Sequence, residues 1–332
     1  MSATPPAGSA SLKLARSNRQ SSARKRADRF GDVALFVICA AAALLAFLVI
    51  ILIAKEVIEG AQPSISKFGV NFITHEEWAP PLEKFGGKGV ILGTLITSTM
   101  ALVIGGPVAI SIGIFLALLA PTSVRNVVSP LVEMLAAIPS VILGFWGLII
   151  LGPVLVSTVE PFLHDAFGFI PIFGAPQTTG NSVFNAGLIL TIMVIPIIAS
   201  VTRDLFMAVP PDLQDGAAAL GSTRWEVIRG VVLPTTISGM TAACLLGLGR
   251  ALGEAIAVAQ VIGGSTESHL SLFKPGGTMA SLIALQFNSA VSKLHTASLY
   301  YLAAILLVIG ILSNLLASWV GRRFGGAGGV TR

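Results

Sequence analysis

Charged residues are scarce in this chain of 332 residues, in which only 11% of positions are charged and 54% are hydrophobic. Soluble domains carry about 25% charged residues, so a soluble globular protein is excluded for most of the chain. Cysteine is nearly absent, and Cys39 and Cys244 both fall in apolar runs, where free thiols are expected. The four histidines lie in predicted loops without metal-ligand spacing, so surface histidines and no metal site are expected. They are His75, His164, His269 and His295.

A phosphate-binding loop is also missing from the sequence. The pattern Gly-x-x-x-x-Gly-Lys-Ser/Thr does not occur, and Gly86-Gly87-Lys88 lacks both the first glycine and the hydroxyl residue. We therefore expect a chain that is not an enzyme and holds no cofactor of its own. If ATP drives its function, the nucleotide and its Mg²⁺ must lie on a partner.

Long apolar runs are what the sequence does contain. Six of them can cross a membrane, which takes roughly 20 residues per helix. They are Val33–Ala54, Gly89–Leu119, Val127–Leu155, Phe184–Met207, Val232–Ile262 and Thr296–Val320. Pro107, Pro139 and Pro196 lie inside these spans, where each removes a backbone hydrogen bond. The sequence thus predicts an all-α, polytopic membrane protein with six transmembrane helices, some of them tilted or broken.

Basic residues are unevenly distributed over the loops between the spans. They gather before the first span, after the second and fourth, and after the sixth, so the positive-inside rule places both termini in the cytoplasm. This predicts Arg125 and Arg224 inside, and Lys84 and Lys274 outside.

The ends of the chain differ in composition from the spans. Residues 1–30 are rich in Ser, Ala and Arg and predict a disordered, basic cytoplasmic tail. Since no aromatic residue precedes Phe30, nucleic-acid binding by this tail is disfavoured. The rest divides into a first helix with an outward loop at 31–88, a membrane domain at 89–321 and a cytoplasmic tail at 322–332.

The polar loop 209–231 between spans four and five predicts two short helices. Asp212 is placed to cap the N-terminus of the first helix, and Gly221 to end it in a left-handed conformation. Thr223 and Glu226 have the spacing of a capping box at the start of the second helix. Such caps alone are equally typical of an ordinary amphipathic linker.

The spacing of this loop resembles the docking loop of ABC importer membrane subunits. That loop is written Glu-Ala-Ala, three residues, Gly, nine residues, Ile, any residue, Leu-Pro, and here the frame reads Asp215-Gly216-Ala217, Gly221 and Val231-x-Leu233-Pro234. The resemblance implies the fold of type I ABC importer permeases (MetI-like), and a loop that docks on an ATPase. The implied coupling residues are Asp212, Asp215, Gly216, Ala217 and Gly221. Gly216 costs about 1 kcal/mol of helix propensity relative to Ala, which suggests close approach by another backbone.

Two ionisable residues lie within predicted span five. Arg250 is near its middle and Glu254 follows four residues later, so a continuous helix would place both on one face. Charges at this depth cost about 2.5–3.5 kcal/mol and are mostly retained where they line a pathway or pair with one another. We expect Arg250 to contact a passing anion and Glu254 to offset its charge; a structural ion pair is the alternative. Gly249 and Gly253 would let a neighbouring helix approach beside them.

Three segments narrow the resemblance to the permeases of phosphate importers. They are Glu133-Met-Leu-Ala-Ala-Ile-Pro-Ser-Val141, Ser222-Thr-Arg-Trp-Glu-Val-Ile-Arg229 and Leu248-Gly-Arg-Ala-Leu-Gly-Glu-Ala255. The resemblance implies a homologous second permease, a pair of ATPase subunits and an external phosphate-binding protein as partners, with phosphate as the cargo. Glu133 itself is expected to cap a helix or contact another helix.

Two alternatives remain open from the sequence. A sister permease, of the same importer or for sulfate or molybdate, would carry much of the same pattern, because an Arg guanidinium binds any tetrahedral oxyanion in a similar way. A secondary transporter or channel without an ATPase is less favoured, because no internal repeat is evident.

Overall fold

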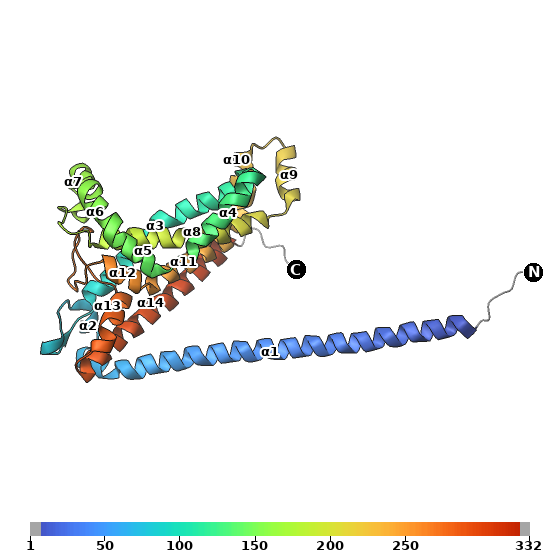
Figure 1. The fold of residues 1–332 in the computed structure, drawn as a ribbon, viewed down its shortest axis with the longest axis horizontal. Coiled ribbons are helices and arrows are strands. Elements are labelled where there is room, and N and C mark those ends of the chain that lie inside the picture. The colour runs from blue at the N-terminus through green and yellow to red at the C-terminus, as the bar shows by residue number, and fades with distance from the viewer. Residues whose placement is uncertain (1–7, 326–332) are drawn as a thin grey trace, which may run out of the picture. The chain divides into compact units, whose positions relative to one another are not determined.

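The computed structural model describes residues 8–325, and helices make up most of this part of the chain (Figure 1). Within it, six helices are long and apolar enough to cross a membrane, which confirms the predicted number of spans. They are Gly31–Phe68, Lys88–Leu119, Ser140–Phe167, Val183–Met207, Arg224–Gly253 and Lys293–Gly321. The chain forms two compact units, residues 1–56 and 57–332. The ends of both predicted tails, residues 1–7 and 326–332, lie outside the described residues.

The first helix, α1, extends over Gly8–Phe68. The sequence predicts a disordered tail up to residue 30, whereas residues 8–30 are helical in the structure. Ala, Leu, Lys, Arg and Gln are good helix formers, and a segment that continues an existing helix needs no new nucleus. Charge and low hydrophobicity therefore do not prevent helix formation here.

The second unit contains the remaining elements. They are α2 (Asn71–Thr74), β1 (Trp78–Ala79), β2 (Lys84–Phe85), α3 (Lys88–Ile114), α4 (Thr122–Ala136), α5 (Ser140–Trp146), α6 (Gly152–Val154), α7 (Glu160–Phe167), α8 (Val183–Met207), α9 (Pro211–Ala219), α10 (Arg224–Val227), α11 (Leu233–Gly253), α12 (Ile256–Val261), α13 (Met279–Gln286) and α14 (Lys293–Gly325). Short 3₁₀ turns occur at Pro80–Leu82, Pro171–Phe173 and Phe287–Ser289, and π-helical turns at Phe115–Leu119, Gly147–Leu151, Leu155–Val159 and Ile228–Val232.

Two predicted spans are wrong in their limits. Span three was expected at Val127–Leu155, but α4 ends at Ala136 and a new helix begins only after Pro139, which is extended with ψ 131°. Proline lacks an N–H and disfavours helical backbone at the preceding residue, so span three runs over Ser140–Phe167. Pro107 and Pro196, in contrast, lie inside continuous helices. Span five, expected at Val232–Ile262, is interrupted after Gly253.

Helix α8 occupies the centre of the second unit. In its most apolar 18-residue window 72% of residues are buried, the largest share among the six spans. Its apolar side chains form one core with residues of α3, α11 and α12. The hydroxyls of Thr191 and Thr202 donate to carbonyls of the same helix, at Gly187 and Ile198. The buried helix therefore carries polar side chains that are already satisfied.

We call the side of the unit that carries loops 69–87, 168–182 and 262–292 the loop side, and the opposite side, which carries α9, the α9 side (Figure 1). On the loop side, strands β1 and β2 form a small antiparallel hairpin over an aromatic cluster. Phe72 stacks on Tyr301 with ring centroids 4.5 Å apart. His295 is 3% exposed and stacks on Phe85, so the expectation of a surface histidine is wrong for this residue. Its place at the start of α14, among aromatic rings, explains the burial.

Loop 262–278 crosses the start of α8 and supplies acceptors for its first N–H groups. The amides of Val183 and Phe184 donate to the carbonyls of Lys274 and Leu272, at 3.1 and 2.8 Å. The loop then lies against α3, where a Cβ built on Gly93 would overlap the carbonyl oxygen of Gly277. The glycine therefore permits backbone-to-backbone contact between the loop and α3.

This contact predicts opposite effects for two glycines of the same helix. Gly93→Ala should destabilise the protein, because overpacking against a backbone costs about 1–3 kcal/mol. Gly106→Ala is the matched control, because a Cβ there would have its nearest neighbour at 3.8 Å, and alanine improves helix propensity by about 1 kcal/mol. Thermal unfolding midpoints of the detergent-purified variants should fall for the first and not for the second. Equal unfolding midpoints for the two variants would show that loop 262–278 can move away from α3 without loss of stability.

Candidate functional site

The first loop helix, α9, begins at Pro211, with Pro210 as its N-cap. Asp212 was expected to be the capping residue and is not, because its side chain makes no capping hydrogen bond and lies within the first turn. Proline suits the first helical position, since it has no N–H to satisfy and its φ is already helical. The helix consequently starts two residues earlier, and the Asp212 carboxylate remains where the helix dipole favours it.

The end of α9 agrees with the prediction. Gly221 has a φ of +90° and follows the C-cap residue Leu220. The amides of Gly221 and Ser222 donate to the carbonyls of Ala218 and Ala217, at 2.9 and 3.2 Å. These two bonds form a Schellman motif, which requires the left-handed residue that glycine provides. The capping box at Thr223 and Glu226 is also present and starts α10.

The two faces of α9 differ in what surrounds them. Leu213, Gly216, Ala217 and Leu220 follow the i, i+3, i+4, i+7 spacing of one helix face. The two leucines are 50% and 89% exposed, and a Cβ built on Gly216 would meet nothing within 4 Å. This face has a leucine at each end and small residues between them, so it leaves space for a protruding group of another protein.

Asp215 lies on the other side of the helix from this exposed face. Together with residues of the π-helical turn that follows α3, of α10 and of the π-helical turn after α10, it lines a cavity of about 320 Å³. Arg224 lines the same cavity, although no ion pair joins the two side chains in the described part of the chain. The predicted coupling residues therefore lie on different faces of α9. Gly216 and Ala217 are on the face with the two leucines, and Asp215, which is itself exposed, is on the face that lines the cavity.

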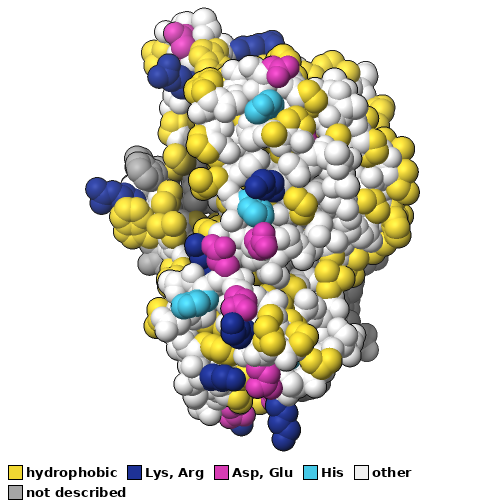
Figure 2. Space-filling view, turned by 90° about the vertical axis from the view of Figure 1, so that its left-hand side faces the viewer, with side chains coloured by type: hydrophobic (Ala, Val, Ile, Leu, Met, Phe, Trp, Pro, Cys, Tyr) yellow, Lys and Arg dark blue, Asp and Glu magenta, His cyan; other side chains and the backbone are white. Residues whose placement is uncertain are grey.

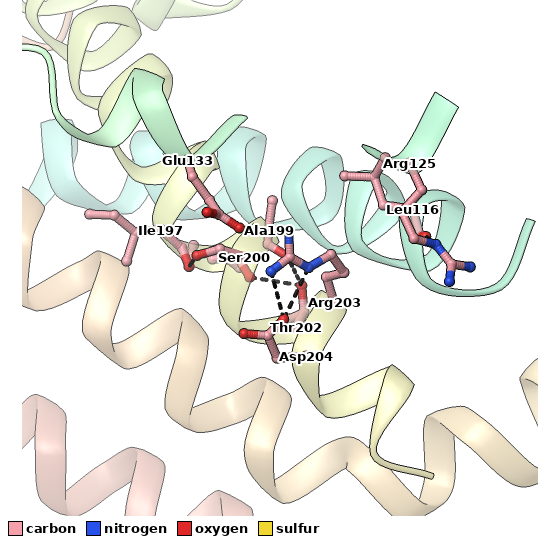
Figure 3. A network of polar contacts seen from close by, with 10 residues as sticks. Leu116, Arg125, Glu133, Ile197, Ala199, Ser200, Thr202, Arg203 and Asp204 are labelled. Carbon is pink, nitrogen blue, oxygen red and sulfur yellow. Dashed lines mark hydrogen bonds and ion pairs between the residues drawn. The ribbon is translucent and has the colours of Figure 1, made fainter. Parts of the chain in front are cut away.

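A polar network holds α4 against α8 next to this loop (Figure 3). Arg203 of α8 donates through Nη1 to the Glu133 carboxylate at 2.8 Å and through Nη2 to Asp204 at 2.7 Å. The Arg203 side chain is only 14% exposed. The interhelical contact predicted for Glu133 is confirmed. Arg203 is a functional residue that was not predicted from the sequence; its position within the last turns of the apolar run Phe184–Met207 was the available signal.

A second arginine of this region is also engaged. The Arg125 guanidinium donates to the carbonyls of Leu116 and Ala117 at 2.7 and 2.6 Å. These carbonyls belong to the π-helical turn that ends span two. Arg125 therefore closes a helix end, in addition to any effect of its charge on membrane orientation.

Arg250 lies on α11 and lines an open cavity of about 660 Å³ bounded by α8, α11 and α14. Gly310 of α14 lines the same cavity and is only three residues from Leu307, the middle residue of span Lys293–Gly321. Arg250 was expected near the middle of span five, but it lies in the last turn of α11, three residues before the break at Gly253. It nevertheless lines this cavity together with a residue near the middle of the last span. Within the described residues its guanidinium has no ion-pair partner, and the side chain is exposed to the cavity.

Glu254 does not share a helix face with Arg250, contrary to the prediction. Its backbone is extended, with φ −72° and ψ 119°, and ends α11. One carboxylate oxygen accepts a hydrogen bond from the Ala257 amide at 3.3 Å, which satisfies an N–H in the first turn of α12. Gly253 immediately before it is a weak helix former, and a carboxylate that can cap the next helix stabilises the break.

Gly249 and Gly253 have no close neighbour among the residues that the structure describes. A Cβ built on either glycine would meet nothing within 4 Å. The neighbouring helix expected beside them is therefore not one of the described helices of this chain.

This chain is similar to known membrane transport proteins over most of its length. Residues 109–326 match the family described as binding-protein-dependent transport system inner membrane component. The phosphate transport system permease protein PstC of Pasteurella multocida is 45% identical over 272 residues, covering 80% of this chain and 84% of that protein. The PstC protein of Mesorhizobium japonicum is 40% identical over 313 residues, covering 93% of this chain and 95% of its own. The chain belongs to the PstC family.

Membership of this family agrees with the six spans and identifies the chain as a multi-pass membrane protein. A chain of a bacterial alginate ABC transporter, solved with a periplasmic protein bound to an alginate pentasaccharide, aligns with a TM-score of 0.57. The alignment covers 89% of this chain and 97% of the solved chain at 17% identity. At that identity the likeness concerns the fold alone, and the predicted fold of ABC importer permeases is confirmed.

Proposed function

We propose that this chain is a membrane subunit of an ATP-driven importer that moves inorganic phosphate across the cytoplasmic membrane. The observation that carries the proposal is Arg250, whose guanidinium has no ion-pair partner among the described residues and is open to a cavity of about 660 Å³ between three spans. A planar guanidinium donates two parallel charge-assisted hydrogen bonds to a tetrahedral oxyanion. The phosphate named for the PstC relatives supports the choice among oxyanions.

The proposed pathway makes a direct prediction for Arg250. Arg250→Gln should reduce uptake of radiolabelled phosphate sharply, because no other cation faces this cavity among its described lining residues. Arg250→Lys should retain part of the uptake, since it keeps the charge and loses the planar fork. Membrane levels of each variant serve as the control.

Three outcomes would contradict parts of this proposal. Normal uptake by Arg250→Gln would exclude the guanidinium from the pathway. If sulfate or molybdate reduced phosphate uptake as strongly as unlabelled phosphate does, the assignment of phosphate as the transported anion would be wrong. Uptake that continues without ATP while the membrane potential is held would indicate a secondary transporter.

The exposed face of α9 supports docking on an ATPase. The leucines at its ends offer apolar contact, and the gap at Gly216 admits a protruding side chain or backbone of a partner. The partner would be a PstB-like ATPase dimer that binds ATP and Mg²⁺, while this chain remains non-catalytic. The Schellman motif fixes the end of α9, so the helix can transmit displacement as a rigid body.

Coupling through α9 can be tested at Gly221. Gly221→Val should uncouple uptake from ATP hydrolysis without loss of membrane insertion, because a left-handed conformation costs an L-residue about 1–2 kcal/mol and is worst for a branched one. Gly221→Asn is the matched control, since asparagine adopts this conformation more readily. If the valine variant transports normally with the ATPase bound, the docking assignment is wrong.

The loop side supports contact with an external protein. Figure 2 shows acidic, basic and histidine side chains gathered along a band of this face. Lys88 donates to the Glu76 carboxylate at 2.6 Å, and Ser268 bonds the same oxygen. The hydrogen bond from Lys88, followed by that from Ser268, lowers the pKa of Glu76. Exposed pairs of this kind are worth about 0–1 kcal/mol, so they can exchange partners at little cost.

The partner at this face would be a PstS-like external phosphate-binding protein. The second wall of the pathway would come from a homologous PstA-like permease, which would also cover Gly249 and Gly253. Membrane lipid would surround the remaining apolar surface.

This arrangement requires the α9 side to face the cytoplasm, and the positive-inside rule places both termini there as well. Single cysteines at Arg224 and Lys274, in a background without Cys39 and Cys244, should report the orientation. An impermeant thiol reagent added to intact cells should label the Lys274 position and not the Arg224 position. Both side chains are exposed, so accessibility within the protein does not distinguish them. Labelling of the Arg224 position from outside would reverse the orientation.

A further inference from the structure

The membrane-spanning part of α14 contains two adjacent polar residues, Ser313 and Asn314, in an otherwise apolar stretch. In the described part of the chain the Asn314 side chain has no hydrogen-bond partner. An unsatisfied amide within a span is costly. No described residue offers the Asn314 amide a hydrogen bond that would offset this cost. The packing of this chain therefore does not explain why a polar residue stands here.

Both residues line the cavity that holds Arg250. Gly310, Ser313 and Asn314 have the i, i+3, i+4 spacing of a single helix face, and all three lie along this cavity. Gly310 lines it together with Gly249 and Arg250. Asn314 is four residues further along α14, which is about 6 Å along the helix axis.

The direction of this displacement follows from the packing of α11 on α14. Near the end of α14, a Cβ built on Gly321 would lie 3.9 Å from the carbonyl oxygen of Ser238. Ser238 is on the α9 side of Arg250 in the same helix. Asn314 therefore lies between the level of Arg250 and the α9 side of the membrane.

We infer that Asn314, with Ser313, forms a second contact for the transported oxyanion, between Arg250 and the cytoplasmic exit. The inference rests on the proposed function. An amide NH₂ and a hydroxyl both donate to anionic oxygens, and they do so without a charge, so they hold the anion more weakly than Arg250 does. An anion that leaves the guanidinium meets donors that guide it onward and do not retain it.

Accessibility of Asn314 gives the first test, and it does not depend on activity. Asn314→Cys is compared with Leu312→Cys, a matched control two residues away on the opposite side of α14. Both are placed in the complete transporter without Cys39 and Cys244, in inside-out membrane vesicles. An anionic methanethiosulfonate reagent should modify position 314, more slowly when inorganic phosphate is in excess, and should leave position 312 unmodified. No reaction at 314, equal reaction at both, or no effect of phosphate would overturn the inference.

Uptake gives the second test. Asn314→Asp has nearly the same size and adds a negative charge, which should lower phosphate uptake roughly tenfold or more by like-charge repulsion. Asn314→Gln keeps the amide and should retain most of the uptake at equal membrane level. Wild-type uptake by Asn314→Asp, while Arg250→Gln is impaired, would refute this inference and leave the proposed function intact. Wild-type uptake by Arg250→Gln would instead refute the pathway itself.

Discussion

Backbone N–H and C=O groups inside a membrane must find partners within the protein, because hydrocarbon offers none and each unpaired group costs several kcal/mol. The second unit meets this requirement at each of the helix ends described above. Glu254 caps the helix that follows its break, Arg125 closes a π-helical turn, and loop 262–278 supplies carbonyls to the start of α8. Once the ends are satisfied in this way, a broken span can expose a charge such as Arg250 to a cavity.

The sequence predicts well what is decided locally. Apolar length alone determines the number of spans, and the left-handed Gly221 and the capping box at Thr223 depend only on neighbouring residues. The limits of spans three and five were wrong because apolar composition continues through both breaks. In span three Pro139 precedes the new helix as its N-cap, and in span five Glu254 offers its carboxylate to the next helix. At each of these two breaks, one residue ends the helix although the surrounding sequence is apolar enough to continue it.

Features that depend on tertiary packing were not predictable from one sequence. An arginine near the cytoplasmic end of a span, such as Arg203, is usually a loop charge. Here α4 places Glu133 beside it, and the two side chains form an ion pair. His295 is buried because Trp78 and Phe85, one from each strand of the β1–β2 hairpin, pack against its ring. Arg250 was found because its charge is unusual at that depth, whereas Asn314, neutral and distant in sequence, becomes visible only as a residue of the same cavity.

The position of α8 has a consequence for how this helix can vary. Its neighbours enclose most of its surface, so it meets other helices over most of its length. In this environment the shape of each side chain matters, as it does in the interior of a water-soluble protein. There, adding or removing a single methylene changes the stability. The hydroxyls of Thr191 and Thr202 and the side-chain NH₂ of Asn185 are buried and donate hydrogen bonds to backbone carbonyls. Hydropathy is therefore a poor guide to tolerated changes in α8, and side-chain volume is the better one.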